Sequence, residues 1–232
     1  MMQLILGLGN KARHGKDTFA AAIDRHYANQ HAAAVKHGLA EYKPIVVQTH
    51  AFADALYKEV NLWLASEDGK RFRAGHGIML PFTVESGFIL PYWVQPTFDA
   101  EVSPRAPYGK HSRLLQWWGT EYRRTQDPDY WVKQWKVGIN PKADIVLCPD
   151  MRFINEAQAV KRLGGYTIQV NRLNPDSTKF VDPSRSAGHP SEIQLDGYDF
   201  DFYITAKTGD LVLLEDWSIT LVRHLRALKG SK

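Results

Sequence analysis

One segment near the beginning of the chain constrains its fold more than any other: an apolar run that ends in a glycine-containing loop. Residues 4–8 read Leu-Ile-Leu-Gly-Leu, and residues 9–18 continue Gly-Asn-Lys-Ala-Arg-His-Gly-Lys-Asp-Thr. A buried strand, a tight loop and the start of a helix, in this order, are the context of the phosphate-binding loop G-x-x-x-x-G-K-S/T. The segment departs from that pattern twice, because Asn10 stands at the first glycine position and Asp17 follows the lysine.

The loop has the chemistry to bind an anion in spite of these departures. Gly15 lets the backbone curl around a phosphate, and Lys16 can reach the β- and γ-phosphates of a nucleotide. Asp17 can ligand Mg²⁺, because hard cations prefer oxygen, and Thr18 offers a hydroxyl one position later. We expect the ATP phosphates to contact Asn10, Lys11, Arg13, His14, Gly15, Lys16, Asp17 and Thr18. The alternative is a glycine turn with a solvated lysine at an ordinary helix start.

Length, charge and cysteine content favour a soluble α/β protein. A chain of 232 residues suffices for one sizeable domain with an inserted lobe. The net charge of +4 fits a basic pocket for phosphorylated small molecules as well as weak binding of nucleic acid. The single cysteine, Cys148, excludes an intramolecular disulfide and fits the reducing cytoplasm. No targeting segment or long apolar run is evident, so we expect a cytoplasmic protein without a membrane span.

Hydrophobic periodicity predicts alternating strands and helices. Strands are expected at 2–8, 45–47, 144–148, 166–170 and 200–204, and helices at 16–29, 52–65, 111–126, 129–138, 153–163 and 208–228. Such alternation predicts a parallel sheet covered on both faces, with ligands beyond the carboxyl ends of the strands. Residues 69–110 are rich in proline, glycine and aromatic residues and show little periodicity, which indicates a functional inserted region.

Five segments, in this order along the chain, resemble those of phage-type deoxynucleoside monophosphate kinases. Gly-Lys-Asp-Thr at 15–18 resembles the phosphate-binding loop of that family, in which aspartate after the lysine is usual. The other four segments are Phe-Ala-Asp-Ala-Leu-Tyr-Lys-Glu at 52–59, Arg-Leu-Leu-Gln-Trp-Trp-Gly-Thr-Glu-Tyr-Arg-Arg at 113–124, Asp-Met-Arg-Phe-Ile-Asn-Glu-Ala at 150–157 and His-Pro-Ser-Glu at 189–192. Together the matches span residues 2–211. The chain departs from the family at Thr205-Ala206, where relatives often carry asparagine.

The resemblance implies the P-loop nucleoside monophosphate kinase fold. A single three-layer domain over residues 1–232 would contain a five-stranded parallel sheet in the order 2-3-1-4-5. It would also contain an acceptor-binding region at about 66–126 and a lid at about 172–192. The implied reaction is Mg²⁺-dependent transfer of the ATP γ-phosphoryl group to a deoxynucleoside monophosphate. The expected partners are these nucleotides. We expect no stable binding of nucleic acid or of membranes, and a homodimer is one possible oligomeric state.

The segment 150–157 supplies candidates for the reaction centre. Asp150 is expected to bind Mg²⁺ or its waters, or to orient Arg152; the alternative is a helix N-cap. Arg152 is expected to face the phosphates, and a surface ion pair is the alternative. Glu156 lies one turn later and is a candidate to steady that arginine or to contact the acceptor, with a solvated helix face as the alternative. The expected metal ligands are therefore Asp17, Thr18 and Asp150.

The expected lid contributes two further arginines. Arg172 and Arg185 flank or lie within it, and an arginine that closes over the phosphates would exclude water. Two exposed loop arginines are an equal alternative. The expected catalytic set is Lys16, Arg152, Arg172 and Arg185. His189 has no second histidine or cysteine at ligand spacing, and Ser191-Glu192 is expected to cap and begin a short helix.

The segment 113–124 is the candidate acceptor site. Arg113 and Arg124 suit an acceptor phosphate, because a planar guanidinium binds phosphate through two donors. Gln116 can hydrogen-bond a base edge, and Trp117 or Trp118 can stack on the base, although tryptophans at helical spacing are more often core. The expected acceptor-binding set is Arg113, Gln116, Trp117, Thr120, Arg124 and Glu156. Arg123 points elsewhere on the helix and is expected to be solvated.

Two other functions remain open at this point. A kinase of the same fold could act on another small acceptor, such as dephospho-coenzyme A, and dependence on a nucleobase would separate the two. A packaging or DNA-binding accessory protein could use the loop as a switch. That protein would bind nucleotide without monophosphate-dependent turnover and would carry a basic DNA-binding face, for which a charge of +4 gives little support.

Overall fold

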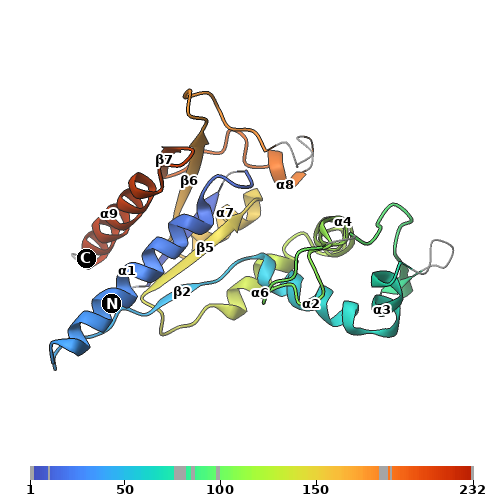
Figure 1. The fold of residues 1–232 in the computed structure, drawn as a ribbon, viewed down its shortest axis with the longest axis horizontal. Coiled ribbons are helices and arrows are strands. Elements are labelled where there is room, and N and C mark those ends of the chain that lie inside the picture. The colour runs from blue at the N-terminus through green and yellow to red at the C-terminus, as the bar shows by residue number, and fades with distance from the viewer. Residues whose placement is uncertain are drawn as a thin grey trace. The chain divides into compact units, whose positions relative to one another are not determined.

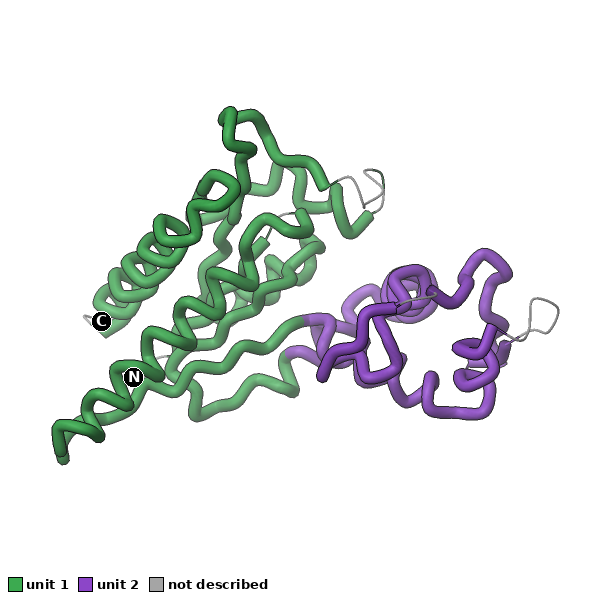
Figure 2. The backbone as a smooth tube through the Cα atoms, viewed as in Figure 1, with its two compact units in different colours: residues 1–51, 136–232 green, residues 52–135 purple. Residues whose placement is uncertain are grey.

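The computed structural model describes residues 3–9, 11–75, 82–84, 87–97, 100–182, 188 and 190–230. The chain forms two compact units, which are residues 1–51 with 136–232 (unit 1) and residues 52–135 (unit 2) (Figure 2). Unit 2 contains the expected inserted region and extends beyond it on both sides, because the helix that precedes 66 and the segment that follows 126 cluster with it. Two predicted site residues, Asn10 and Arg185, lie outside the described residues.

Unit 1 is built on a five-stranded parallel sheet in the order β2-β5-β1-β6-β7. Its strands are β1 (Leu4–Gly9), β2 (Val47–Thr49), β5 (Ile145–Met151), β6 (Tyr166–Leu173) and β7 (Phe202–Lys207). Counted along the chain, this is the order 2-3-1-4-5, so the predicted topology is confirmed. β1 is central, with Leu4 opposite Ile145 of β5 and Leu6 opposite Tyr166 of β6. All six residues of β1 are buried, as expected for a strand covered on both faces.

Helices cover both faces of this sheet (Figure 1). They are α1 (Lys16–Lys36), α7 (Ile154–Arg162) and α9 (Leu211–Gly230), whereas the short α8 (Pro190–Ile193) lies beyond the ends of the strands. Leu4, Leu6 and Leu8 pack in one cluster with Phe19 of α1 and Leu214 of α9. Side chains alternate along a strand, so Gly7 and Gly9 face the other way. A Cβ at Gly7 would lie 3.0 Å from Val160, which places α7 on that second face. The result is a three-layer α/β unit.

Unit 2 is mainly helical. It contains α2 (Ala53–Ala65), α3 (Glu67–Arg73), α4 (Ser112–Gln116), α5 (Arg123–Gln126), the beginning of α6 (Tyr130–Gly138) and a hairpin of β3 (Thr83–Val84) with β4 (Phe88–Ile89). The single helix predicted at 111–126 is interrupted, because residues 117–122 form the π-helical turn η2 (Trp117–Tyr122) between α4 and α5. The unit has its own core, in which Val60, Trp63 and Leu64 of α2 pack with Trp118 and Tyr122.

No helix in the described part of the chain is long and apolar enough to cross a lipid bilayer.

Candidate functional site

The loop between β1 and α1 makes a tight left-handed turn at the carboxyl end of the central strand. Gly15 is the N-cap of α1 with φ +94°, and Arg13 has φ +59°. A left-handed residue directly before a helix gathers successive N–H groups into a concavity that suits an anion. A Cβ at Gly15 would lie only 2.8 Å from Leu214 of α9, in addition to the strain of its φ angle. The backbone conformation at this position therefore favours glycine, whereas the end of the Leu214 side chain could move to admit a Cβ.

Lys16 lies beneath this turn and is almost completely buried. Its side chain is 5% exposed, and its Nζ donates to the carbonyl oxygen of Lys11 at 2.5 Å. Burial lowers the pKa of Lys16 from the usual 10.5 to about 7, and the positive charge of Arg152 is the second cause. Three carboxylates oppose this lowering of the pKa, those of Asp17, Glu192 and Asp150. Lys16 thus shares one electrostatic environment with Arg152, Asp17 and Asp150, which sequence analysis assigned to the same site.

Arg152 follows β5 and is held at both its backbone and its guanidinium. Its backbone N–H donates to Oε2 of Glu156 at 2.7 Å, and its Nη1 donates to Oε1 of Glu192 at 2.8 Å. The side chains of Arg152 and Glu192 are 20% and 5% exposed, so this is not the surface ion pair considered above. The buried carboxylate of Glu156 also accepts the N–H of Phe153 at 3.1 Å and caps α7. The alternative of a solvated helix face for Glu156 is therefore wrong, and its carboxylate holds the backbone of Arg152.

Asp150 is the next-to-last residue of β5 and is half-buried. Its Oδ1 accepts from the Cys148 thiol at 3.5 Å. The helix α7 begins only at Ile154, with Phe153 as its N-cap, so the alternative that Asp150 caps a helix is wrong. The residue remains a candidate for an ion beside the loop.

Arg172 and His14 join the loop to the end of β6. The backbone N–H of Arg172 donates to Nδ1 of His14 at 3.2 Å, and its Nη1 donates to the carbonyl oxygen of Arg13 at 3.3 Å. The guanidinium also donates to Thr208 at 2.9 Å and lies 4.2 Å from the ring centroid of Phe180. Arg172 is therefore part of a strand and packs against the loop, instead of being an exposed loop arginine.

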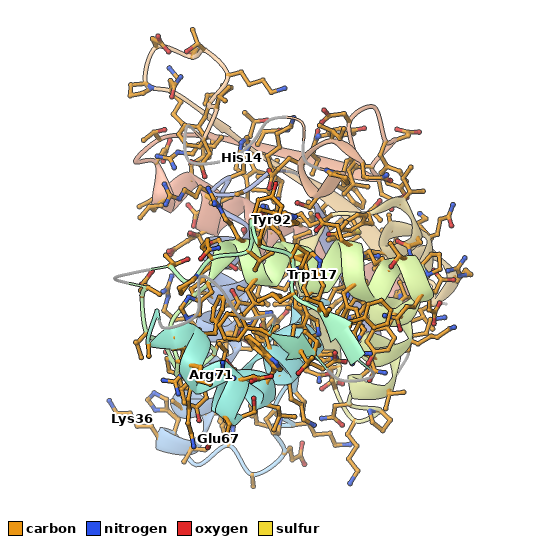
Figure 3. The ribbon with its side chains drawn as sticks, turned by 90° about the vertical axis from the view of Figure 1, so that its right-hand side faces the viewer. His14, Lys36, Glu67, Arg71, Tyr92 and Trp117 are labelled. Atoms are coloured by element: carbon orange, nitrogen blue, oxygen red, sulfur yellow. The ribbon has the colours of Figure 1, made fainter. Side chains whose placement is uncertain are left out.

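His14 is buried inside this arrangement (Figure 3). Burial lowers its pKa to about 4, and the nearby charge of Lys16 is the second cause. An imidazole that accepts a hydrogen bond at Nδ1 must be neutral. His14 consequently adds no positive charge to the loop at neutral pH, in contrast to the two other basic residues of the turn.

Those two basic residues are ion-paired with the segment that follows β6. Lys11 pairs with Asp196 at 3.2 Å, and Arg13 pairs with Asp182 at 3.5 Å. At the start of α1, Asp17 is exposed and Thr18 is half-buried. Among the described residues, the structure has no group of three or more His, Cys, Asp or Glu side chains that could hold a metal. The expected oxygen ligands Asp17, Thr18 and Asp150 suit Mg²⁺, which usually takes one or two carboxylates and completes its shell with water and phosphate.

In unit 2, four of the predicted acceptor residues lie on the accessible side of α4, η2 and α5. Arg113 is exposed, whereas Gln116, Thr120 and Arg124 are half-buried. Arg113 and Gln116 are three positions apart on α4 and are therefore neighbours on its surface, whereas Thr120 lies within the π-helical turn and Arg124 lies beyond it. We refer to these four accessible residues together as the stripe. Arg113 Nη1 donates to the Trp93 carbonyl oxygen at 3.5 Å, and Arg124 Nη1 donates to that of Pro128 at 3.3 Å. The stripe combines two guanidinium groups, a carboxamide and a hydroxyl.

Trp117 does not belong to that stripe. It is 5% exposed and stacks on Tyr122 with the ring centroids 5.3 Å apart and 7° between the ring planes. The core alternative holds for this tryptophan, because its face is already covered by a protein ring. The predicted base stacking by Trp117 lacks support, because the side chain is buried and presents no accessible ring face.

Arg123 was expected to be solvated, and this is wrong. Its Nε donates to Oε2 of Glu59 at 2.7 Å, with the side chains 15% and 20% exposed. Glu59 also accepts from the indole N–H of Trp118 at 3.0 Å and from the hydroxyl of Tyr130. The π-helical turn shifts the helix face by about one residue, which brings Arg123 towards α2. Periodicity alone could not reveal that shift.

Glu192 is the main functional candidate that sequence analysis missed. A short helix does begin at Pro190, as expected, but Glu192 points inward and is buried. Its Oε2 accepts the backbone N–H of Ala12 in the loop at 3.4 Å, while Oε1 accepts from Arg152. Only the presence of this glutamate in the His-Pro-Ser-Glu element could have drawn attention to it.

Comparison with models of protein families and with curated proteins finds no match to this chain. Its function must therefore be inferred from the chemistry of the site. That site combines a strand-loop-helix anion cradle, a buried ammonium, a tethered guanidinium and nearby carboxylates, a set of groups suited to a nucleotide polyphosphate and its magnesium ion.

Proposed function

We propose that the protein is an ATP- and Mg²⁺-dependent kinase that converts deoxynucleoside monophosphates to diphosphates. The observation that carries the proposal is the buried Lys16, which lies under a left-handed glycine turn between the central strand and α1. Burial of an ammonium is costly unless a negative charge compensates it. A bound polyphosphate would supply that charge and raise the pKa of Lys16 from about 7, so that the lysine acts as a cation.

Phosphoryl transfer needs positioning and charge stabilisation more than covalent chemistry. The N–H groups of the turn and Lys16 would bind the β- and γ-phosphates of ATP. Arg152 would donate to the transferring group, where a guanidinium stabilises charge that develops on the equatorial oxygens. Arg172 would act indirectly, because its contacts with His14 and the Arg13 carbonyl hold the shape of the turn.

The magnesium ion would be held by oxygen ligands at the start of α1 and the end of β5. Asp17 and Asp150 offer carboxylates, and Thr18 offers a hydroxyl. The ion would neutralise charge on the β- and γ-phosphates when bound.

The acceptor monophosphate would bind to the stripe on unit 2. Arg113 and Arg124 would bind its phosphate, and Gln116 and Thr120 would hydrogen-bond the nucleoside. The stacked rings of Trp117 and Tyr122 in the core of unit 2 would support these residues from behind.

Coupled measurement of ADP release tests the proposal. Mg-ATP is supplied with each of dAMP, dGMP, dCMP, dTMP and their ribose counterparts, and in a separate reaction with dephospho-coenzyme A. Release that depends on a deoxynucleoside monophosphate supports the kinase. Release with dephospho-coenzyme A alone would assign another acceptor, and ATP binding without any monophosphate-dependent release would assign a nucleotide-binding switch.

A further inference from the structure

A buried glutamate connects two parts of the proposed reaction centre. Glu192 of α8 is 5% exposed at its side chain, and its two carboxylate oxygens have different partners. Oε1 accepts from Nη1 of Arg152 at 2.8 Å, and Oε2 accepts the backbone N–H of Ala12 at 3.4 Å. One carboxylate thus links the guanidinium to the loop that would bind the polyphosphate.

The contacts of Arg152 show which of its donors are engaged. Besides Glu192, Nη1 lies 3.5 Å from the carbonyl oxygen of Ser191, and the backbone N–H is held by Glu156. Within the described part of the chain, the hydrogen bonds of this guanidinium involve Nη1 alone. A guanidinium has five N–H donors, so Nε and Nη2 are left to bind a phosphate while Nη1 is anchored.

Burial of Glu192 needs an explanation, because an isolated carboxylate is costly to remove from water. The carboxylate lies close to two cations of the site: it pairs with Arg152, and its negative charge raises the pKa of Lys16, which the charge of Arg152 lowers. A carboxylate at this place could compete with a phosphate for the cations. Alternatively, it could fix a cation so that phosphate finds it in place.

We propose that Glu192 is a positioning residue that holds Arg152 in register with the phosphate-binding loop. This inference rests on the proposed function, in which Arg152 contacts the transferring phosphoryl group. The Ala12 contact decides between the two possibilities above, because it ties the carboxylate to the backbone at the start of the loop, so that Arg152 and the loop keep one geometry. A small displacement of a group that acts on the transition state costs much of the rate. Glu192 itself touches neither nucleotide.

A double-mutant cycle tests whether Glu192 acts through Arg152. The variants are Glu192→Gln, Arg152→Ala and the double variant, and kcat, KM for the monophosphate and ATP affinity are measured for each. Glutamine keeps the shape and removes the charge. We expect Glu192→Gln to lower kcat on the order of 10- to 100-fold and ATP affinity about tenfold or less, with KM for the monophosphate nearly unchanged. In the Arg152→Ala background the same substitution should have no further effect.

Glu215→Gln is the matched control, because Glu215 pairs with Arg25 at 2.6 Å elsewhere in unit 1. It should leave kcat and ATP affinity unchanged. If Glu192→Gln does not fold, Glu192→Asp, which keeps the charge but is one methylene shorter, takes its place in the cycle with the same expected coupling.

Two results would overturn the inference. Losses that add in the double variant would mean that Glu192 acts independently of Arg152. A gain in ATP affinity for Glu192→Gln would mean that the carboxylate competes with phosphate. If the wild-type protein phosphorylates no monophosphate, the proposed kinase fails, and the cycle is read from ATP affinity alone: coupling there supports positioning of Arg152, and additivity refutes it.

Discussion

The ammonium of Lys16 donates to the carbonyl oxygen of Lys11 at 2.5 Å, five positions earlier in the same loop. The lysine is therefore held against the turn before any ligand is present. Groups that are already in place lose less entropy when a ligand binds, which favours both affinity and catalysis. A polyphosphate would add negatively charged oxygens beside the buried lysine and would stabilise its positive charge.

Removal of the Lys16 side chain should abolish nucleotide-dependent function. For Lys16→Ala we expect ATP affinity to fall on the order of 100-fold or more, because the residue supplies the buried cation of the anion site. The fold should persist, since the substitution also removes a buried charge. Isothermal titration with Mg-ATP measures the affinity, and circular dichroism checks the fold. An unchanged affinity in a folded variant would remove Lys16 from the site.

Binding of ATP should be coupled to uptake of a proton. The pKa of Lys16 is about 7 in the free protein, so much of the side chain is neutral above that pH. A bound polyphosphate raises the pKa, and the complex then takes up about one proton at pH 8. Since the complex holds more protons than the free protein, ATP affinity should fall as the pH rises above 7. Calorimetry in buffers of different ionisation enthalpy counts the protons, and Lys16→Ala should take up fewer.

His14 should make the protein less stable in mild acid. Its pKa is about 4 in the folded protein and 6.5 for an ordinary histidine, so the unfolded chain binds more protons between these values. The stability due to neutral His14 is present above pH 6.5 and is lost as the pH falls towards 4. His14→Asn keeps an acceptor for the Arg172 N–H but cannot titrate. The loss of thermal stability between pH 7 and pH 5 should therefore be smaller in this variant, and an equal loss would contradict the assignment.

Glu59 should be important for the stability of unit 2. Loss of its carboxylate removes the ion pair with Arg123 and the hydrogen bond from the Trp118 indole, so Glu59→Ala should lower the free energy of unfolding by about 3 kcal/mol. Urea denaturation measures the change. Glu67→Ala is the control, because Glu67 pairs with Lys70 on the surface of α3 and should cost about 0.5 kcal/mol or less (Figure 3). Equal effects of the two substitutions would contradict the buried network.

Substitutions in the stripe should change the KM for the monophosphate, whereas a substitution in the core behind it should change stability instead. Arg113→Ala and Arg124→Ala should each raise KM for the monophosphate about tenfold and leave KM for ATP unchanged, because each removes a charged donor to the acceptor. Trp117→Phe should leave both KM values within about twofold and lower the stability by about 1–2 kcal/mol, because the ring packs in the core. A large rise in KM for Trp117→Phe would restore the base-stacking role.

The sheet could be predicted from the sequence because four of its five strands contain apolar residues in a local pattern that periodicity records. The fifth strand was predicted at 45–47, but β2 is Val47–Thr49 (Val-Gln-Thr), so the apolar Ile45 and Val46 precede the strand that pairs with β5. Strand ends were less accurate. Phe200 was placed in the last strand, yet β7 begins at Phe202, because Phe200 packs its ring against Gly9 without joining the ladder. Apolar residues mark the core, whereas the ladder is set by backbone hydrogen bonds.

Only the part of the site that lies in one short segment of the chain could be predicted from the sequence. Residues 11–18 are close in space because they are close in sequence. The link from Glu192 to Arg152 spans 40 positions, and the pairing of Arg123 with Glu59 spans 64, so no local pattern contains either. The π-helical turn at Trp117–Tyr122 added a second obstacle, because it changes which side of the helix each arginine occupies.

Direct detection of the transferred group tests the central claim most closely. The wild-type protein and Lys16→Ala are incubated with Mg²⁺, γ-labelled ATP and a deoxynucleoside monophosphate, and the products are separated. The account predicts label in the deoxynucleoside diphosphate with the wild-type protein and none with Lys16→Ala. Label that stays in ATP or appears as inorganic phosphate, whichever monophosphate is supplied, would contradict it.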